Sequence, residues 1–227
     1  MVVTQIWSHR GRVGPETTLV DNTVAAVSAA VDSGAEGVEI DTWRCSDGVF
    51  VLTHDRETPA GWVDRCRVGD LAHLDRLDDV LWVGGRGTLN IELKLPPEST
   101  PAEQARLGEA LADDLGRAGA ERLSVVVSSF SEDATRAVRA SGLAVRVGHL
   151  CAEVPGPATL EQLAGLGYWG VHFLASAASL EHVGEISAAG LAAVAWTVND
   201  PGMAAGLVER GVDVIITDVP VILLEAR

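Results

Sequence analysis

Short runs of β-branched and apolar residues alternate with Ala- and Leu-rich stretches over most of this chain. This alternation constrains the fold more than any other feature, because strands separated by helices form βαβ units and a parallel sheet. Some runs, such as 125–127 and 214–216, are apolar throughout, as expected for strands covered on both faces. The predicted strands are Val3–His9, Gly37–Trp43, Thr88–Leu95, Leu123–Ser129, Ala144–Leu150, Gly170–Ala175, Ala192–Val198 and Val212–Thr217.

Capping signals divide the intervening stretches into helices. Asp21-Asn22-Thr23 is expected to cap a helix over Val24–Val31, and Thr100-Pro101 opens another over Ala102–Arg117. Eight parallel strands joined by helical crossovers predict a (β/α)8 TIM barrel, and we expect residues 1–227 to form a single domain. The alternative is a doubly wound open sheet, although no GxGxxG segment follows the first strand.

The charge of the chain argues against one class of partner. The formal net charge is −15, the isoelectric point is near 4.7, and the 17 basic residues are scattered along the sequence. We expect no nucleic-acid partner, because proteins that bind nucleic acids present clustered basic side chains. A small phosphorylated ligand would need a cation, or a local Arg or Lys, to overcome the negative field.

The sequence carries no signal for export or for membrane insertion. Its first residues lack a basic segment followed by an apolar stretch, and no apolar run reaches roughly 18 residues. The three cysteines are widely spaced and form no CxxC pair, which favours free thiols. We expect a cytoplasmic protein without a stable membrane anchor, and the oligomeric state stays open.

A β-hairpin with a short insertion interrupts the alternation after the second strand. Only a few residues separate two β-rich stretches around Asp47-Gly48, a pair typical of a two-residue hairpin turn. A turn centred on these two residues places Ser46 opposite Val49. The numbers of any two residues that face each other across the hairpin then add up to 95. Asp41 is therefore predicted to lie opposite His54.

Three carboxylates fall on neighbouring barrel strands. Glu39 and Asp41 are two positions apart and share one strand face, and Glu92 shares a face with Lys94 on the next barrel strand. Carboxylate oxygens are the ligands that Mg²⁺ and Ca²⁺ prefer, so these three residues predict a site for one divalent cation, with Lys94 beside it to neutralise a phosphoryl oxygen. The structural alternatives are a solvated strand edge and a buried Glu92–Lys94 ion pair.

Two histidines and an arginine complete the predicted site. His9 ends the first strand, so its ring is expected at the C-terminal mouth of the barrel, where such folds place their chemistry. With His54 directed at Asp41, two histidines would bracket the cation, one taking a proton from a nucleophile and one giving a proton to a leaving oxygen. Arg10 could hold a phosphate through paired hydrogen bonds.

An ordered set of short motifs covers most of the chain: Ser8-His9-Arg10-Gly11, Asp21-Asn22-Thr23, Gly37-Val38-Glu39-Ile40-Asp41-Thr42, Ser46-Asp47-Gly48, Val51-Leu52-Thr53-His54-Asp55, Asn90-Ile91-Glu92-Leu93-Lys94, Ser129-Phe130, Ala195-Trp196-Thr197-Val198-Asn199 and Ile216-Thr217-Asp218-Val219-Pro220. This set resembles the glycerophosphodiester phosphodiesterases over residues 8–220. The resemblance implies a small-molecule substrate, a glycerophosphodiester, hydrolysed to glycerol 3-phosphate and an alcohol.

The same resemblance implies a role for each matching residue. The metal ligands would be Glu39, Asp41 and Glu92, the acid/base pair His9 and His54, and the phosphate-contacting cations Arg10 and Lys94.

Two departures from the family pattern bear on the substrate. Asp21-Asn22-Thr23 stands where the family has Pro-Glu-Asn-Thr, and only 37 residues, 55 to 91, separate His54 from Glu92, fewer than is usual in the family. The longer family insertion helps to wall the substrate pocket. One alternative is therefore a phospholipase D-like phosphodiesterase on lysophospholipids, for which 60–63 is the only candidate apolar loop, and another is a non-catalytic barrel that binds phosphometabolites.

Several further side chains could approach the site. Phe130 and Trp196 could line the pocket for the glycerol or the alcohol, although core packing explains Trp196 equally well. Asp218 is expected to orient a neighbour such as Arg10 or to cap its loop. His149 and His172 lie on barrel strands, and we assign His149 to a hydrogen-bonded structural role and His172 to the core.

Overall fold

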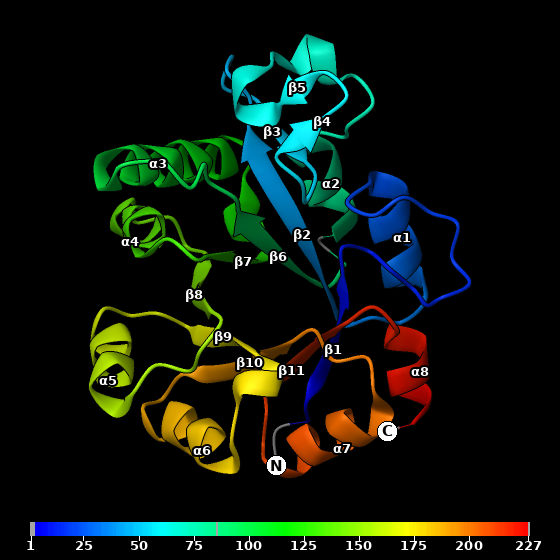
Figure 1. The fold of residues 1–227 in the computed structure, drawn as a ribbon, viewed down its shortest axis with the longest axis vertical. Coiled ribbons are helices and arrows are strands. Elements are labelled where there is room, and N and C mark those ends of the chain that lie inside the picture. The colour runs from blue at the N-terminus through cyan, green and yellow to red at the C-terminus, as the bar shows by residue number, and fades with distance from the viewer. Residues whose placement is uncertain (1–2, 85, 227) are drawn as a thin grey trace.

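A closed barrel of eight parallel strands forms the centre of the molecule in the computed structural model, which describes residues 3–84 and 86–226 (Figure 1). Strand β1 pairs with β11 on one side and with β2 on the other, which closes the sheet. The barrel strands are β1 (Gln5–His9), β2 (Gly37–Arg44), β6 (Thr88–Leu93), β7 (Ser124–Ser129), β8 (Arg146–Cys151), β9 (Gly170–Leu174), β10 (Ala192–Trp196) and β11 (Val214–Thr217). The predicted (β/α)8 barrel is confirmed.

Helices connect successive barrel strands and cover the outside of the barrel (Figure 1). The N-cap of the first helix is Thr23, whose hydroxyl accepts a hydrogen bond from the backbone NH of Ala26 at 3.1 Å, while Asp21 instead forms an ion pair with Arg12. The helices are α1 (Val24–Asp32), α2 (Leu77–Gly84), α3 (Pro101–Arg117), α4 (Glu132–Ala140), α5 (Pro157–Gly165), α6 (Leu180–Ala188), α7 (Pro201–Glu209) and α8 (Pro220–Glu225).

Two aromatic residues fill the N-terminal half of the barrel interior. The rings of Trp7 and Trp169 stack with their centroids 6.0 Å apart, and the guanidinium of Arg146 lies 4.6 Å from the Trp169 ring. A Cβ atom at Gly37 would lie 2.7 Å from the Trp7 ring, so only glycine leaves room for the indole. These two indoles close the N-terminal half of the interior, so a ligand can enter only from the C-terminal half.

The hairpin after β2 is present, but its predicted register is wrong by one residue. Strand β3 (Phe50–Leu52) pairs with β2 so that Thr42 faces Leu52, and facing numbers sum to 94. Gly48 has a φ of 94°, which lets a three-residue loop close the turn where two residues were expected. The residue next to Asp41 is consequently Thr53, whose backbone NH donates to the Asp41 carbonyl at 3.2 Å, and His54 lies one position further on.

A small cap follows the hairpin and includes β4 (Glu57–Thr58) and β5 (Gly61–Trp62). The guanidinium of Arg56 pairs with Asp64 at 2.7 Å and with Glu98 at 2.6 Å, which ties the cap to the loop after β6. The same group lies 4.2 Å from the ring of Trp62, and Arg65 lies 4.1 Å from that ring. The indole of Trp62, in the candidate apolar loop at 60–63, is therefore in contact with two guanidinium groups.

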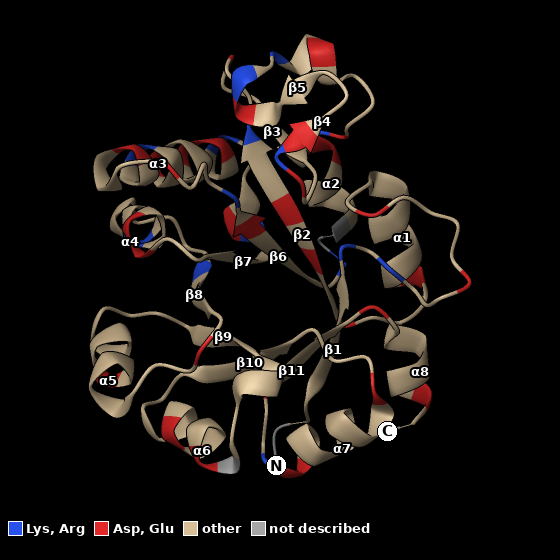
Figure 2. Ribbon diagram, viewed as in Figure 1, with Lys and Arg blue, Asp and Glu red and all other residues tan. Residues whose placement is uncertain are grey.

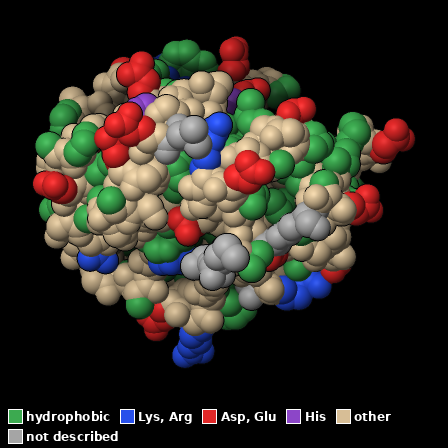
Figure 3. Space-filling model, turned by 90° about the horizontal axis from the view of Figure 1, so that it is seen from below, with side chains coloured by type: hydrophobic (Ala, Val, Ile, Leu, Met, Phe, Trp, Pro, Cys, Tyr) green, Lys and Arg blue, Asp and Glu red, His purple; other side chains and the backbone are tan. Residues whose placement is uncertain are grey.

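Charged side chains are distributed unevenly over the molecule. Acidic residues mark the middle of β2 and the end of β6 inside the barrel, whereas most other charges lie on helices and loops (Figure 2). Seen from below, the surface shows separate acidic and basic side chains with no continuous basic stripe on that face (Figure 3). Among the described residues, no helix is long and apolar enough to span a lipid bilayer.

Candidate active site

A cavity of about 280 Å³ lies at the C-terminal end of the barrel. Parallel strands direct their carboxyl ends to this mouth, so inward-facing side chains near those ends meet there. The structure brings together at this cavity eight of the nine site residues predicted from the sequence: His9, Arg10, Glu39, His54, Glu92, Lys94, Phe130 and Trp196. The ninth, Asp41, is buried beside Lys94 and Arg10.

The acidic triad of Glu39, Asp41 and Glu92 is buried and compact. The three residues are between 1% and 9% exposed, and each offers an oxygen within 4.8 Å of the other two. Strand β2 supplies the first two carboxylates on one face, and its parallel register with β6 places Asp41 beside Glu92. A solvated strand edge is thereby excluded for these residues.

Crowding of the three carboxylates shifts their protonation. Burial raises the pKa of Glu39 well above its usual value, and the charges of Asp41 and Glu92 add to this effect. Burial also raises the pKa of Glu92 to about 7, against the opposing charge of Lys94. Asp41 is equally buried, but Lys94 and Arg10 outweigh burial and lower its pKa. Full ionisation of the triad near neutral pH therefore requires additional positive charge.

The donor set of the triad fits a hard divalent cation. Glu39 Oε1 is buried and has no hydrogen-bond partner among the described residues, although a buried carboxylate oxygen normally has one. Mg²⁺ and Ca²⁺ bind carboxylate oxygens and keep further positions for water or substrate oxygens. Glu39, Asp41 and Glu92 are thus the residues that could hold a metal ion in this chain.

Two cations sit beside the triad and face the cavity. Lys94 Nζ lies 2.6 Å from Glu92 Oε1 and 3.0 Å from Asp41 Oδ1, and Arg10 Nε lies 3.1 Å from Asp41 Oδ2. The predicted Glu92–Lys94 ion pair is therefore present, and it forms part of the site. Both cations also line the cavity, where a phosphate oxygen could reach them.

Asn22 holds Asp41 in place and was not recognised as a site residue from the sequence. Its side-chain amide donates to Asp41 Oδ2 at 2.9 Å, and its carbonyl oxygen accepts from the Asp41 backbone NH at 2.9 Å. The backbone of Asn22 has a φ of 56°, a left-handed conformation that asparagine tolerates better than most residues. The available signals were the position of Asn22 just before the α1 cap and its place in the Asp21-Asn22-Thr23 motif.

His9 is the last residue of β1 and lies on the inward face that it shares with Trp7. A carboxylate outside the cavity orients its ring. Its Nδ1 lies 2.7 Å from Asp218 Oδ1, and Asn199 donates to the other Asp218 oxygen at 2.7 Å. Burial opposes ionisation of Asp218, but the hydrogen bonds from His9 and Asn199 prevail and lower its pKa to about 2. Since an ionised carboxylate only accepts hydrogen bonds, His9 Nδ1 carries the hydrogen and Nε2 is directed toward Glu39, 3.9 Å away.

Asp218 was expected to orient a neighbour such as Arg10 or to cap its loop, and the neighbour that it contacts is His9 and not Arg10. Arg10 turns toward Asp41, with a backbone φ of 57° and its NH donating to the Glu39 carbonyl at 2.8 Å. Asp218 instead contacts His9 and Arg12, whose guanidinium lies 3.2 Å away.

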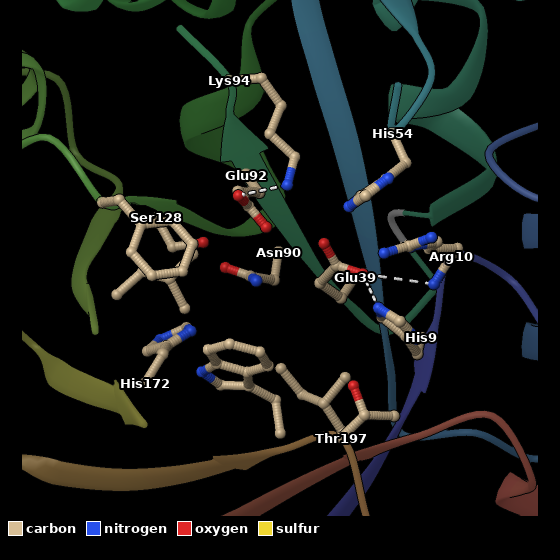
Figure 4. A pocket seen from close by; sticks show the side chains of 14 residues that line it. His9, Arg10, Glu39, His54, Asn90, Glu92, Lys94, Ser128, His172 and Thr197 are labelled. Carbon is tan, nitrogen blue, oxygen red and sulfur yellow. Dashed lines mark hydrogen bonds and ion pairs between the residues drawn. The ribbon is translucent and has the colours of Figure 1, made fainter. Parts of the chain in front are cut away.

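His54 approaches the cavity from the loop after β3. Its Nδ1 lies 2.8 Å from Asp55 Oδ1, and its backbone carbonyl accepts a hydrogen bond from the Trp43 indole at 3.2 Å. Figure 4 shows the rings of His9 and His54 on the same side of the cavity, above and below Arg10, with Glu39 facing them. The side chain of His54 is 44% exposed, more than the 16% of His9.

The rest of the lining consists of aromatic, polar and aliphatic side chains, and the aliphatic ones are Leu150 and Ile216. Phe130 and Trp196 pack edge to face with their centroids 6.0 Å apart, and both line the cavity. His172 is fully buried, as expected of a core residue, yet it lines the same cavity, as do Asn90 and Ser128. The period of two along a strand links Asn90 with Glu92, a signal that sequence reasoning did not use.

His149 does not reach the cavity. Its ring packs edge to face against Tyr168 at 6.4 Å. Its Nδ1 is buried, and among the described residues this nitrogen makes no hydrogen bond.

The match of this chain to a family of phosphodiesterases shows that it is a phosphoric diester hydrolase. It belongs to the glycerophosphoryl diester phosphodiesterase family, which matches residues 9–222. No curated protein sequence matches the chain significantly.

Solved structures of similar proteins share the fold over nearly the whole chain. A phosphodiesterase from Oleispira antarctica, solved with its product sn-glycerol-3-phosphate, is 24% identical, with 99% of this chain and 96% of that chain covered and a TM-score of 0.85. A glycerophosphodiester phosphodiesterase from Parabacteroides distasonis is 24% identical, with coverage of 98% and 95% and a TM-score of 0.86. One from Thermotoga maritima is 21% identical, with coverage of 99% and 98% and a TM-score of 0.77.

Proposed function

We propose that this chain hydrolyses glycerophosphodiesters to glycerol 3-phosphate and an alcohol, with one divalent cation, Mg²⁺ or Ca²⁺, held by Glu39, Asp41 and Glu92. The observation that carries the proposal is the convergence of two histidines and two of these carboxylates on one cavity. The similar Oleispira antarctica enzyme has sn-glycerol-3-phosphate as its product, which supports this choice of substrate.

Phosphodiester cleavage needs phosphate binding, charge stabilisation and proton transfer, and different side chains serve each of them. Arg10 and Lys94 bind the non-bridging phosphoryl oxygens and orient the phosphorus atom. A cation bound to the triad would stabilise the negative charge that develops on those oxygens. One of the two histidines removes a proton from the attacking water molecule, whose oxygen bonds to phosphorus, and the other protonates the oxygen of the alcohol that leaves as its bond to phosphorus breaks.

Each histidine is prepared for proton transfer by a carboxylate. Asp218 holds His9 Nδ1, and Asp55 lies at hydrogen-bond distance from His54 Nδ1, which leaves each Nε2 for the substrate. A carboxylate behind an imidazole fixes its tautomer and stabilises the imidazolium form. The half-buried Asp218 holds His9 more firmly than the exposed Asp55 holds His54.

The test is hydrolysis of glycerophosphocholine and glycerophosphoethanolamine with Mg²⁺, with Ca²⁺ or with EDTA. We expect activity that requires a metal and falls at least about 100-fold in His54→Gln, with His182→Gln on helix α6 as the matched control. Activity that survives both EDTA and His54→Gln would overturn the mechanism. Cleavage of lysophospholipids alone would favour the phospholipase D-like alternative, and binding without turnover would favour a non-catalytic barrel.

A further inference from the structure

The segment that carries His54 is anchored on both sides of this residue. On one side, the backbone NH of Thr53 donates to the Asp41 carbonyl at 3.2 Å. On the other side, the Arg56 carbonyl accepts a hydrogen bond from the Val63 backbone NH at 2.8 Å, and the Arg56 side chain extends to the loop after β6. The side chain of His54 is itself 44% exposed, so its position depends on these anchors more than on packing.

The Arg56 guanidinium is bound by two carboxylates at once. Its Nε and Nη2 lie 2.7 and 2.8 Å from the two Asp64 oxygens, and its Nη1 and Nη2 lie 2.8 and 2.6 Å from the two Glu98 oxygens. Asp64 belongs to the cap, whereas Glu98 belongs to the loop between β6 and α3. We call the Arg56–Glu98 ion pair the clasp.

The clasp is better placed to restrain the chain than an ordinary surface ion pair. Exposed pairs contribute little, because solvent screens them and both side chains lose conformational freedom. The Arg56 side chain is only 15% exposed, and its paired hydrogen bonds to both carboxylates fix the plane of the guanidinium. Hydrogen bonding from Arg56 lowers the pKa of Glu98 to about 2, so this carboxylate is ionised near neutral pH.

Apolar packing holds the cap to the hairpin and not to the loop after β6. In the cap, Val63 and Leu71 are fully buried and belong to an apolar cluster with Trp43 of β2. In the part of the chain that the structure describes, this cluster includes no residue of the loop between β6 and α3. The cap therefore depends on Glu98 for its connection to that loop.

The clasp joins the two segments that bring His54 and Lys94 to the cavity. Arg56 lies two residues after His54, and Glu98 lies four residues after Lys94. Figure 4 shows both side chains entering the cavity from its upper end. Lys94 is also held by two carboxylates of the triad, at 2.6 and 3.0 Å, so the clasp matters chiefly for His54. The cavity lining contains neither Arg56 nor Glu98, so the clasp can affect the reaction only through the residues that it holds.

We propose that Arg56 is a positioning residue, which through its clasp with Glu98 holds His54 where the imidazole can exchange a proton with the substrate. This role rests on the proposed function, in which His54 is one of the two acid/base residues. The clasp removes freedom from the His54 segment before substrate arrives, and correct placement of a reacting group is a large part of catalysis.

Steady-state hydrolysis of glycerophosphocholine with Mg²⁺ tests the proposal. Glu98→Ala removes the clasp at an exposed position, and Arg56→Met removes the guanidinium. We expect kcat to fall about tenfold in each variant with KM nearly unchanged, because the phosphate-binding side chains stay in place. Asp32→Ala is the matched control, since Asp32 forms a surface ion pair with Arg86 at 2.8 Å and lies outside the cavity; it should keep the kcat of the wild type. An unchanged kcat in either clasp variant would overturn the proposal.

A double-mutant comparison separates the positioning of His54 from a general loosening of the cap. In a His54→Gln background, Glu98→Ala should lower kcat no further, because the residue that the clasp holds is already lost. The same fold-loss in both backgrounds would show that the clasp acts on the cavity as a whole and would refute the assigned role.

The placement of the His54 ring can also be measured without turnover. In protein labelled with ¹³C-histidine, the ring signal of His54 is the one that is missing from the spectrum of His54→Gln. We expect Glu98→Ala to shift or broaden this signal and to leave that of the buried His172 unchanged, whereas Asp32→Ala should alter neither. An unaltered His54 signal in Glu98→Ala would refute the proposal.

The proposal and the proposed function fail in different ways. A His54 signal that changes in Glu98→Ala, in a protein that hydrolyses no glycerophosphodiester, would support the clasp and refute the function. Hydrolysis of glycerophosphocholine with the same kcat in Glu98→Ala, and with an unchanged His54 signal, would refute the clasp alone.

Discussion

His9 Nδ1 lies 2.7 Å from Asp218 Oδ1, although the two residues are 209 positions apart in the chain. The contact exists because β1 and β11 are neighbours in the closed barrel, with Ser8 beside Thr217. It joins a histidine predicted from a motif to a carboxylate that the sequence assigned to another partner. The orientation of the proposed acid/base residue therefore depends on the closure of the barrel.

Asp218→Asn should lower kcat about 10- to 100-fold with little change in KM. The amide can donate a hydrogen bond to His9 Nδ1 and so select the wrong tautomer, whereas Asp218 does not line the cavity and does not touch the substrate. Steady-state kinetics on glycerophosphocholine measure the effect. Asp213→Asn is the control, since Asp213 accepts a hydrogen bond from the Ala193 backbone at the opposite end of the barrel; similar losses of kcat in both variants would contradict the assigned role.

The same carboxylate should stabilise the fold in a pH-dependent way. The pKa of Asp218 is lowered to about 2 from its ordinary value of 3.8, so its contribution to stability is present above about pH 4 and is lost as the pH falls toward 2. After allowance for solvent screening we expect about 1 kcal/mol. The free energies of urea unfolding of the wild type and Asp218→Asn should differ by this amount near neutral pH and converge on acidification; a difference that widens in acid would contradict the lowered pKa.

Addition of Mg²⁺ or Ca²⁺ should raise the melting temperature of the protein. At a cation concentration about 100 times Kd, the gain is about 2.7 kcal/mol, or roughly 5–10 °C for a chain of this size. Glu39→Gln should abolish this increase without lowering the melting temperature in EDTA, because it removes one of three repelling carboxylates. Glu57→Gln, an exposed residue of the cap, should behave like the wild type. An increase that persists in Glu39→Gln would rule out the triad as the metal site.

Asn22→Ala should destabilise the protein by about 2–4 kcal/mol and weaken metal binding. Two hydrogen bonds that hold Asp41 are lost, and alanine is strained at a φ of 56°. Asn22→Gly loses the same hydrogen bonds but tolerates the backbone conformation, so it should recover about 1 kcal/mol of that loss. Urea unfolding with calorimetric metal titration separates the two effects, and equal stability of both variants would show that backbone strain contributes nothing.

The local pattern of the sequence was sufficient to predict the barrel strands and most of the site residues. All eight predicted barrel strands are present, with ends displaced by no more than two residues. Because side chains alternate between the two faces of a strand, Glu39 and Asp41 share one face, as do Glu92 and Lys94. This holds for any fold in which these segments are strands. Likewise, a histidine at the end of a parallel strand has to emerge at the C-terminal mouth.

Tertiary structure decided what depends on register and on closure. Gly48 adopts a positive φ and closes a three-residue loop, a choice between turn types that the Asp47-Gly48 pair alone does not settle, and it moves His54 one position along the strand. The pairing of His9 with Asp218 depends on which strands become neighbours when the sheet closes. His172 shows the same limit: its side chain belongs to a buried strand by pattern, and only the packing of the barrel places this residue in the lining of the cavity.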